Sequence, residues 1–217
     1  MIRLISPSSS LYNTAILGSR GLKNNFSAGE WLKKVKLNLN KISKLIAKLF
    51  KTNYFRVYTS DDLLGCELAG SAKSIIALAV GMVVGMGLGE NTQATIITRG
   101  LNEVSKLGVA LGANPLTFAG LAGMGDLVAS CSSGLSRNRT FGEVLGGGNS
   151  MNEARLKVNK TVEGVATAGA VLEIAHSLGV EVPIIEAVAD VVSNTLTPAE
   201  AVQRLMALNI GAEIDHV

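Results

Sequence analysis

The sequence has few of the residues that build aromatic β-sandwiches, disulfide-linked domains or metal centres. Aromatic residues make up 4% of its 217 residues, and there are only four prolines, two cysteines and two histidines. The low aromatic content favours helix packing over an aromatic-rich sandwich. Cys66 and Cys131 have no CxxC spacing, and His176 and His216 lie far from other ligand types, so we expect no metal site. A reduced, cytoplasmic protein is the simplest interpretation.

Small and apolar residues are abundant instead. Hydrophobic residues make up 47% of the chain, and glycine occupies 24 positions. Residues 74–89 carry no charge and repeat glycine at Gly81, Gly85 and Gly89. This run, bracketed by Lys73 and Glu90, is shorter than a membrane crossing needs. It predicts a helix buried at the centre of the domain, with glycines that let a neighbouring helix approach closely.

Charge divides the chain into two parts of opposite sign. Eleven of its 20 Lys and Arg residues, but only one acid, Glu30, lie between Met1 and Tyr58. The remainder holds nine basic and 16 acidic residues. We therefore predict a basic N-terminal segment, residues 1–52, followed by a helical domain, residues 53–217. The acidic character of the larger part argues against a nucleic-acid-binding protein.

The basic segment is expected to contain an amphipathic helix at residues 31–50. Apolar residues recur there at steps of three and four, and lysines fill the opposite face. This helix either packs on its own domain, the interpretation that we favour, or attaches to an anionic membrane surface or a partner groove. Residues 1–28 include six serines and no acid. Organellar transit peptides share this composition, so an organellar location is the alternative to the cytoplasm.

Helices dominate the expected structure of the larger part. Residues 55–59 (Phe-Arg-Val-Tyr-Thr) alternate in character and are β-prone, which predicts one short strand. Capping boxes at residues 150–153 and 197–200 each begin a helix, and Gly179 ends another. The chain has no Gly-Lys-Ser/Thr phosphate loop and no alternation of strands with helices. We conclude that the fold class is all-α and that a doubly wound nucleotide-binding sheet is excluded.

Two groups of residues could carry chemistry. Lys73 lies at the start of the uncharged apolar run, where partial desolvation would lower the pKa of its amine and suit it to act as a general acid or base. A lysine whose charged end reaches solvent from a helix end explains the same position equally well. Residues 123–130 and 136–139 (Ser-Arg-Asn-Arg) bring a carboxylate, hydroxyls, an amide and guanidinium groups into an otherwise apolar region. This set suits a small phosphorylated ligand, and the alternative is a polar surface loop. Arg99 is expected to anchor a ligand or to pair with Asp126 or Glu103.

Six segments of the sequence occur in the same order in a known family: residues 55–62, 65–73, 87–91, 97–100, 120–127 and 135–139. Through them the chain resembles the bacterial-type NAD(P)-dependent glycerol-3-phosphate dehydrogenases, and the resemblance covers roughly residues 44–210. It implies an all-helical substrate domain of the 6-phosphogluconate dehydrogenase C-terminal-like type.

The resemblance also implies an activity and a set of site residues. The family reversibly reduces dihydroxyacetone phosphate to sn-glycerol 3-phosphate, a phospholipid precursor, with NAD or NADP as cofactor, and its members are commonly homodimers. Lys73 matches the catalytic proton donor of the family. The matched substrate-binding residues are Asp126, Ser136, Arg137 and Asn138, and the matched cofactor-binding residues are Arg137, Thr161 and Glu163.

The sequence departs from the family in two ways that bear on function. Ser74 replaces the asparagine that usually follows the catalytic lysine, which shortens a hydrogen-bonding arm. No glycine fingerprint for a dinucleotide precedes Phe55. We therefore expect a substrate-binding half that acts only when a nucleotide-binding domain is supplied. The alternative is a non-catalytic helical remnant that binds a partner or a membrane.

Overall fold

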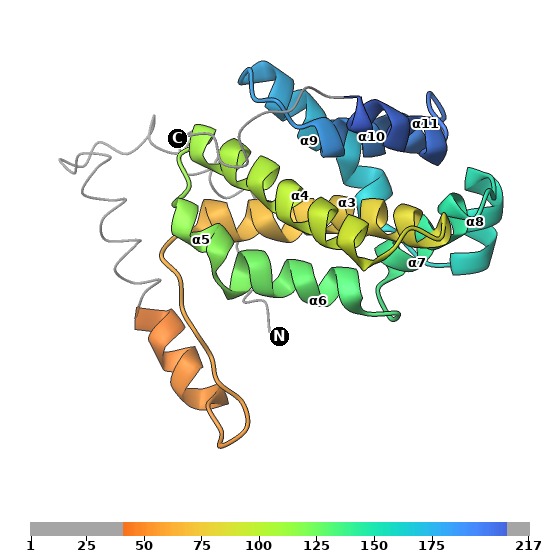
Figure 1. The fold of residues 1–217 in the computed structure, drawn as a ribbon. Helices are drawn as coiled ribbons and strands as arrows, with labels where there is room; N and C mark the ends of the chain where they lie inside the picture. Colours follow the sequence, from red (N-terminus) through yellow and green to blue (C-terminus); the bar gives the residue numbers. More distant parts are fainter. Residues whose placement is uncertain (1–40, 208–217) are drawn as a thin grey trace, which may run out of the picture. The chain divides into compact units, whose positions relative to one another are not determined.

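The apolar run after Asp62 forms a long helix at the centre of the fold. The computed structural model describes residues 41–207. Helix α3, Leu63–Gly85, comprises 23 residues and begins well before the uncharged run. By length and composition it could cross a membrane, but most of its apolar side chains are buried. Its ribbon runs among the other helices of the bundle (Figure 1). The prediction of a buried central helix is confirmed.

Helix α7, Arg137–Gly146, crosses α3 at a distance that only glycine permits. Cβ atoms on Gly81 and Gly85 of α3 would lie 2.0 Å and 2.1 Å from backbone carbonyl oxygens of α7. Cβ atoms on Gly142 and Gly146 of α7 would lie 2.1 Å and 2.0 Å from carbonyl oxygens of α3. Both helices therefore contribute a pair of glycines spaced four residues apart, so that the two backbones touch directly.

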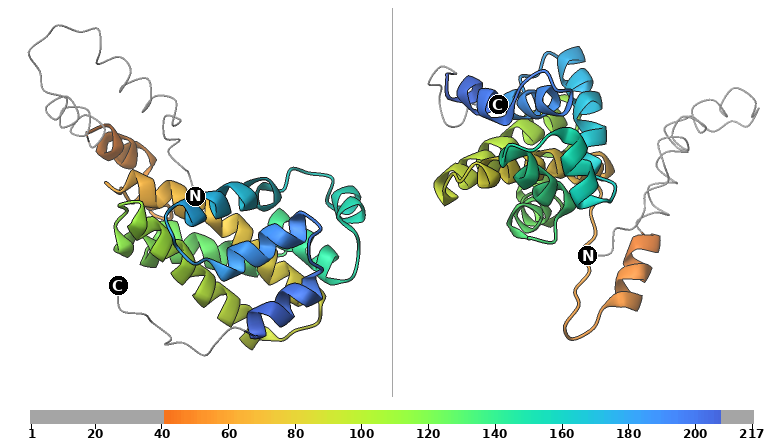
Figure 2. Two further views of the ribbon diagram at one scale, coloured as in Figure 1. Left: turned by 90° about the horizontal axis from the view of Figure 1, so that it is seen from above. Right: turned by 90° about the vertical axis from the view of Figure 1, so that its right-hand side faces the viewer.

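The remaining helices surround α3 in layers. Two views agree that α9, α10 and α11 lie on one side of the α3–α4 pair and α6 on the other (Figures 1 and 2). A Cβ atom on Gly89, the third glycine of the sequence repeat, would meet no neighbour, and this residue is the N-cap of α4 instead. The other elements are α4 Glu90–Ala110, α5 Pro115–Ala119, the π-helical turn η1 Leu121–Gly125, α6 Asp126–Ser132, α8 Met151–Val158, α9 Glu163–Ser177, α10 Pro183–Val192 and α11 Pro198–Met206.

Local sequence signals set several helix ends as expected. Ser150 and Thr197 each accept a hydrogen bond from the backbone N–H three residues ahead, and the glutamate at that position accepts one from the backbone N–H of the cap residue. Both capping boxes are thus confirmed. Helix α9 ends just before Gly179, whose φ of 66° lies in the left-handed region that glycine adopts without strain.

A buried carboxylate caps helix α10 from a different helix. Glu103 of α4 accepts hydrogen bonds from the backbone N–H groups of Ile184 (2.8 Å) and Ile185 (3.1 Å) in the first turn of α10. Burial raises the pKa of Glu103 to about 7, although these two hydrogen bonds pull the pKa down. The expected partner Arg99 is exposed on α4. Glu103 therefore serves packing between α4 and α10.

The strand predicted at residues 55–59 does not form, and that prediction was wrong. These residues have no regular secondary structure, and they follow a turn in which Thr52 Oγ1 accepts hydrogen bonds from the backbone N–H groups of Tyr54 (3.4 Å) and Phe55 (3.0 Å). A strand needs a second strand to satisfy its backbone groups, and residues 41–207 contain none. Local β propensity is therefore not sufficient here.

The structure divides between Leu63 and Leu64 into two units. Residues 41–50 of the first unit are helical, in agreement with the second half of the predicted amphipathic helix. Residues 31–40 and the serine-rich start of the chain lie outside the described residues. The whole helical bundle described above belongs to the second unit, from which α3 extends back by one residue to Leu63.

Candidate functional site

The central feature of the site is an ion pair between α3 and α6. Lys73 Nζ donates a hydrogen bond to Asp126 Oδ2, although the two residues are 53 positions apart in the sequence. Their side chains are only 18% and 15% exposed. The sequence placed both among its candidates but did not predict that they meet. The pair holds one ammonium donor in a fixed, partly desolvated position.

A π-helical turn directly precedes Asp126. Residues Leu121–Gly125 form this turn, which runs into α6, and such turns are frequent at functional sites. Gly123 is essential to the turn, because a Cβ atom there would lie 2.1 Å from the carbonyl oxygen of Phe118. Gly123 thus allows the close packing on which this turn depends.

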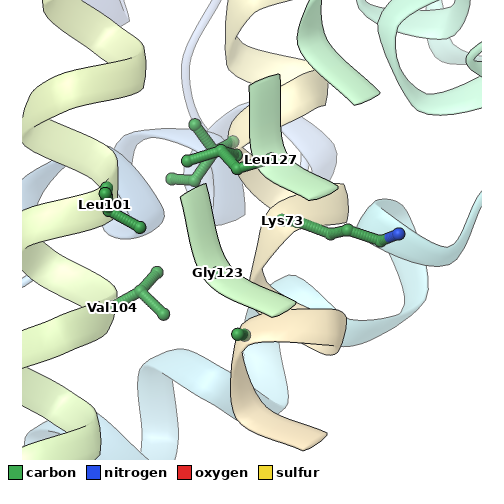
Figure 3. Close-up of a pocket in the computed structure, with 7 residues that line it drawn as sticks. Lys73, Leu101, Val104, Gly123 and Leu127 are labelled. Atoms are coloured by element: carbon green, nitrogen blue, oxygen red, sulfur yellow. The ribbon is translucent and has the colours of Figure 1, made fainter. Parts of the chain in front are cut away.

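A small apolar recess lies beside Lys73. The aliphatic stem of Lys73 lines it together with Leu101 and Val104 of α4 and Leu127 of α6. Figure 3 shows that the Lys73 amino nitrogen points away from Leu101 and Val104. The recess therefore lies along one side of Lys73, while the charged end of the lysine is presented on the opposite side.

The Ser-Arg-Asn-Arg segment begins helix α7. Ser136 is the N-cap residue, and its hydroxyl accepts a hydrogen bond from the backbone N–H of Arg139 (3.4 Å). Arg137 is exposed and able to reach a ligand, and it makes a long ion pair with Glu163 (3.7 Å). Asn138 Oδ1 accepts a hydrogen bond from the backbone N–H of Gly164 (2.8 Å). The predicted phosphate-binding residues therefore share one helix start.

Glu163 links this segment to α3. Its two carboxylate oxygens lie 3.7 Å from the Arg137 guanidinium and 3.5 Å from the hydroxyl of buried Ser74. Thr161 is exposed in the loop before α9. The structure therefore brings Arg137 and Asn138 at the start of α7 close to Glu163 at the start of α9, next to the residue that follows Lys73.

One residue of the site was not predicted from the sequence. Gly164 lets the start of α9 touch α3, because a Cβ atom there would lie 2.5 Å from the carbonyl oxygen of Ser74 and 3.0 Å from Asn138 Oδ1. The available signal was a glycine in the first turn of an expected helix, where alanine is the better helix former. Such a glycine indicates close packing.

Comparison with known proteins places the chain in a family. The family model described as NAD-dependent glycerol-3-phosphate dehydrogenase C-terminus matches residues 62–203, a range that contains every site residue discussed above. The chain belongs to this family. It is 53% identical over 155 residues to glycerol-3-phosphate dehydrogenase [NAD(P)+] of Streptomyces griseus, and 54% identical over 158 residues to that of Thermobifida fusca.

These matches cover most of this chain but only about half of the length of each relative. They span 71% and 73% of the chain, but only 46% and 47% of the Streptomyces and Thermobifida proteins. Among solved structures, glycerol-3-phosphate dehydrogenase from Coxiella burnetii superposes with a TM-score of 0.75 at 38% identity, covering 78% of this chain and 52% of that one. The all-α fold class is therefore confirmed.

Proposed function

We propose that this chain is the substrate-binding half of an NAD(P)-dependent glycerol-3-phosphate dehydrogenase, acting on dihydroxyacetone phosphate and sn-glycerol 3-phosphate. The observation that carries the proposal is the Lys73–Asp126 pair, which joins two of the sequence segments that carry the resemblance to the family. The names of the relatives support the same reaction.

Lys73 is the proton donor in this proposal. In the direction of reduction, the ketone oxygen gains a proton from Lys73 Nζ as its carbon gains a hydride, so that an N–H bond breaks and an O–H bond forms. In the reverse direction the amine takes the proton from the alcohol. Asp126 fixes the direction of the ammonium group and stabilises its charge, while the apolar wall formed with Leu101 and Val104 holds the lysine stem.

The start of α7 is the proposed phosphate site. Arg137 offers a planar guanidinium that can bind two phosphate oxygens at once. Backbone N–H groups in the first turn of α7 add to this anion site. Asn138 holds the start of α9 next to this anion site, because its Oδ1 accepts the hydrogen bond from the backbone N–H of Gly164. The dianionic phosphate would then sit beside, and not on top of, the proton donor.

Residues of this half also suit the edge of a dinucleotide site. When bound, NAD(P)H would supply the hydride. The half-exposed charges of Arg137 and Glu163 and the exposed hydroxyl of Thr161 are suited to phosphate and ribose groups. Residues 41–207 contain no strand, so these residues provide one side of such a site and not its sheet.

Binding and turnover test the proposal separately. Isothermal titration with glycerol 3-phosphate should show binding by the full chain, and Arg137→Ala should weaken it about 10- to 100-fold because a charge-assisted contact is lost. Arg155→Ala, an exposed arginine on α8, is the matched control. Equal binding by both variants would contradict the phosphate site. NADH oxidation with dihydroxyacetone phosphate, after adding the dinucleotide-binding half of the Thermobifida protein, should be lost in Lys73→Met.

One observation favours a second candidate, a non-catalytic helical binding protein. Ser74 replaces the usual asparagine, and its hydroxyl is buried and faces Glu163. It therefore does not extend toward a substrate beside Lys73. Binding of glycerol 3-phosphate without any turnover in the reconstituted mixture would support this candidate. The homodimer and the cytoplasmic location expected from the resemblance and the cysteine content stay predictions.

A further inference from the structure

Three cations of the candidate site are each paired with a carboxylate, and one of these ion pairs is open to solvent. The pairs are Lys73–Asp126, Arg139–Glu143 and Arg137–Glu163. The side chains of the first two pairs are at most 30% exposed, whereas those of Arg137 and Glu163 are 46% and 54% exposed. Water competes for a half-exposed pair and leaves it weakly held. A ligand can therefore open this pair more readily than the other two.

The backbones on either side of the Arg137–Glu163 pair are joined independently of it. Asn138, which follows Arg137, accepts the hydrogen bond from the backbone N–H of Gly164, which follows Glu163 (2.8 Å). Gly164 also packs so closely on α3 that a Cβ atom there would lie 2.5 Å from the carbonyl oxygen of Ser74. The starts of α7 and α9 therefore stay side by side when the ion pair opens. The pair opens by rotation of its two half-exposed side chains.

Glu163 and a phosphate group would use the same donor of Arg137. Glu163 Oε1 lies 3.7 Å from Arg137 Nη2, and Nη2 is one of the two terminal nitrogens with which a guanidinium can bind two phosphate oxygens at once. Glu163 Oε2 accepts a hydrogen bond from the Ser74 hydroxyl (3.5 Å), which keeps the carboxylate between α3 and the guanidinium. Because the carboxylate is tethered next to its cation, its effective concentration there is high.

We propose that Glu163 is an internal competitor of the substrate phosphate at Arg137, an inference that rests on the proposed function. Phosphate binding exchanges one ion pair for another, because the guanidinium turns from the carboxylate to the phosphate. Glu163 then remains nearby as a like charge. Both effects lower the affinity of the site for phosphate esters. Glu163 is thus a positioning residue, which acts through Arg137 and limits how tightly the phosphate group is held.

Isothermal titration of the full chain with glycerol 3-phosphate and with inorganic phosphate tests the proposal. Glu163→Gln keeps the shape of the side chain and removes its charge, so it should tighten the binding of both ligands about three- to tenfold. A merely structural role at the start of α9 would give weaker binding instead. The gain should be absent when Arg137→Ala is compared with Arg137→Ala/Glu163→Gln. It should also shrink as salt is added, because salt screens charge.

Glu173→Gln is the matched control. It removes the same charge from an exposed position of the same helix, about 15 Å further along the axis, and should bind both ligands like the unaltered chain. Unchanged or weaker binding by Glu163→Gln, or an equal gain in Glu173→Gln or without Arg137, overturns the competition but leaves the phosphate site in place. Binding that does not depend on Arg137, or no binding by any variant, overturns the phosphate site and the competition together.

Discussion

The close crossing of α3 and α7 predicts that a single methyl group added at the crossing destabilises the fold. In Gly142→Ala, the added Cβ atom would lie 2.1 Å from the carbonyl oxygen of Leu78 and 2.8 Å from the backbone nitrogen of Met82. Ordinary contacts of a Cβ atom begin at 3.4 Å. Since both neighbours are backbone atoms of the central helix, neither can rotate away. The helices must separate by about 1 Å, which also opens the contacts of the other three glycines at the crossing.

The expected change in the free energy of unfolding of Gly142→Ala follows from two opposing effects. Overpacking of a core typically costs about 1–3 kcal/mol, and a clash of backbone with backbone belongs at the upper end. Replacing glycine by alanine inside a helix gains about 1 kcal/mol of helix stability. The net expectation for Gly142→Ala is a loss of about 2 kcal/mol in the free energy of unfolding. For a domain of this size, that loss corresponds to a Tm lower by about 4–8 °C.

Gly169→Ala is the control that isolates the crossing. Gly169 also lies inside a helix, α9, but a Cβ atom there would meet nothing within 4 Å. This variant should gain up to about 1 kcal/mol and raise the Tm by a few degrees. Urea denaturation and calorimetry on both variants measure the difference. If Gly142→Ala were as stable as Gly169→Ala, the direct backbone contact between α3 and α7 would be refuted.

Three further variants probe the site and its supports. Because the pKa of Glu103 is about 7 in the folded protein, folding binds a proton and the free energy of unfolding falls as pH rises from about 4.5 to about 7; Glu103→Gln should flatten that profile in urea titrations. Gly164→Ala should weaken glycerol 3-phosphate binding at least about tenfold by calorimetry, since its Cβ atom would push against the Ser74 carbonyl. Asp126→Asn should lower the free energy of unfolding by about 1–3 kcal/mol by leaving Lys73 without this counter-charge; an unchanged value would argue against the ion pair.

Local features of the chain were predictable because they depend on a few neighbouring residues. The capping boxes at Ser150 and Thr197 satisfy backbone groups within one helical turn, so the sequence alone determined where α8 and α11 begin. The uncharged, glycine-containing run likewise determined a buried central helix. The order of the motifs around Lys73 and Asp126 determined the family, since several ordered matches constrain the chain far more than one does.

Contacts between distant parts of the chain were decided only by tertiary structure. The sequence could not show that Lys73 meets Asp126, that Glu103 caps α10, or that Gly164 rests on Ser74. Each of these depends on how helices cross, and crossing is set by the summed packing of many side chains. The β-prone residues 55–59 also show that local sequence is not sufficient. Their side chains favour a strand, but a strand requires a partner strand, and residues 41–207 provide none.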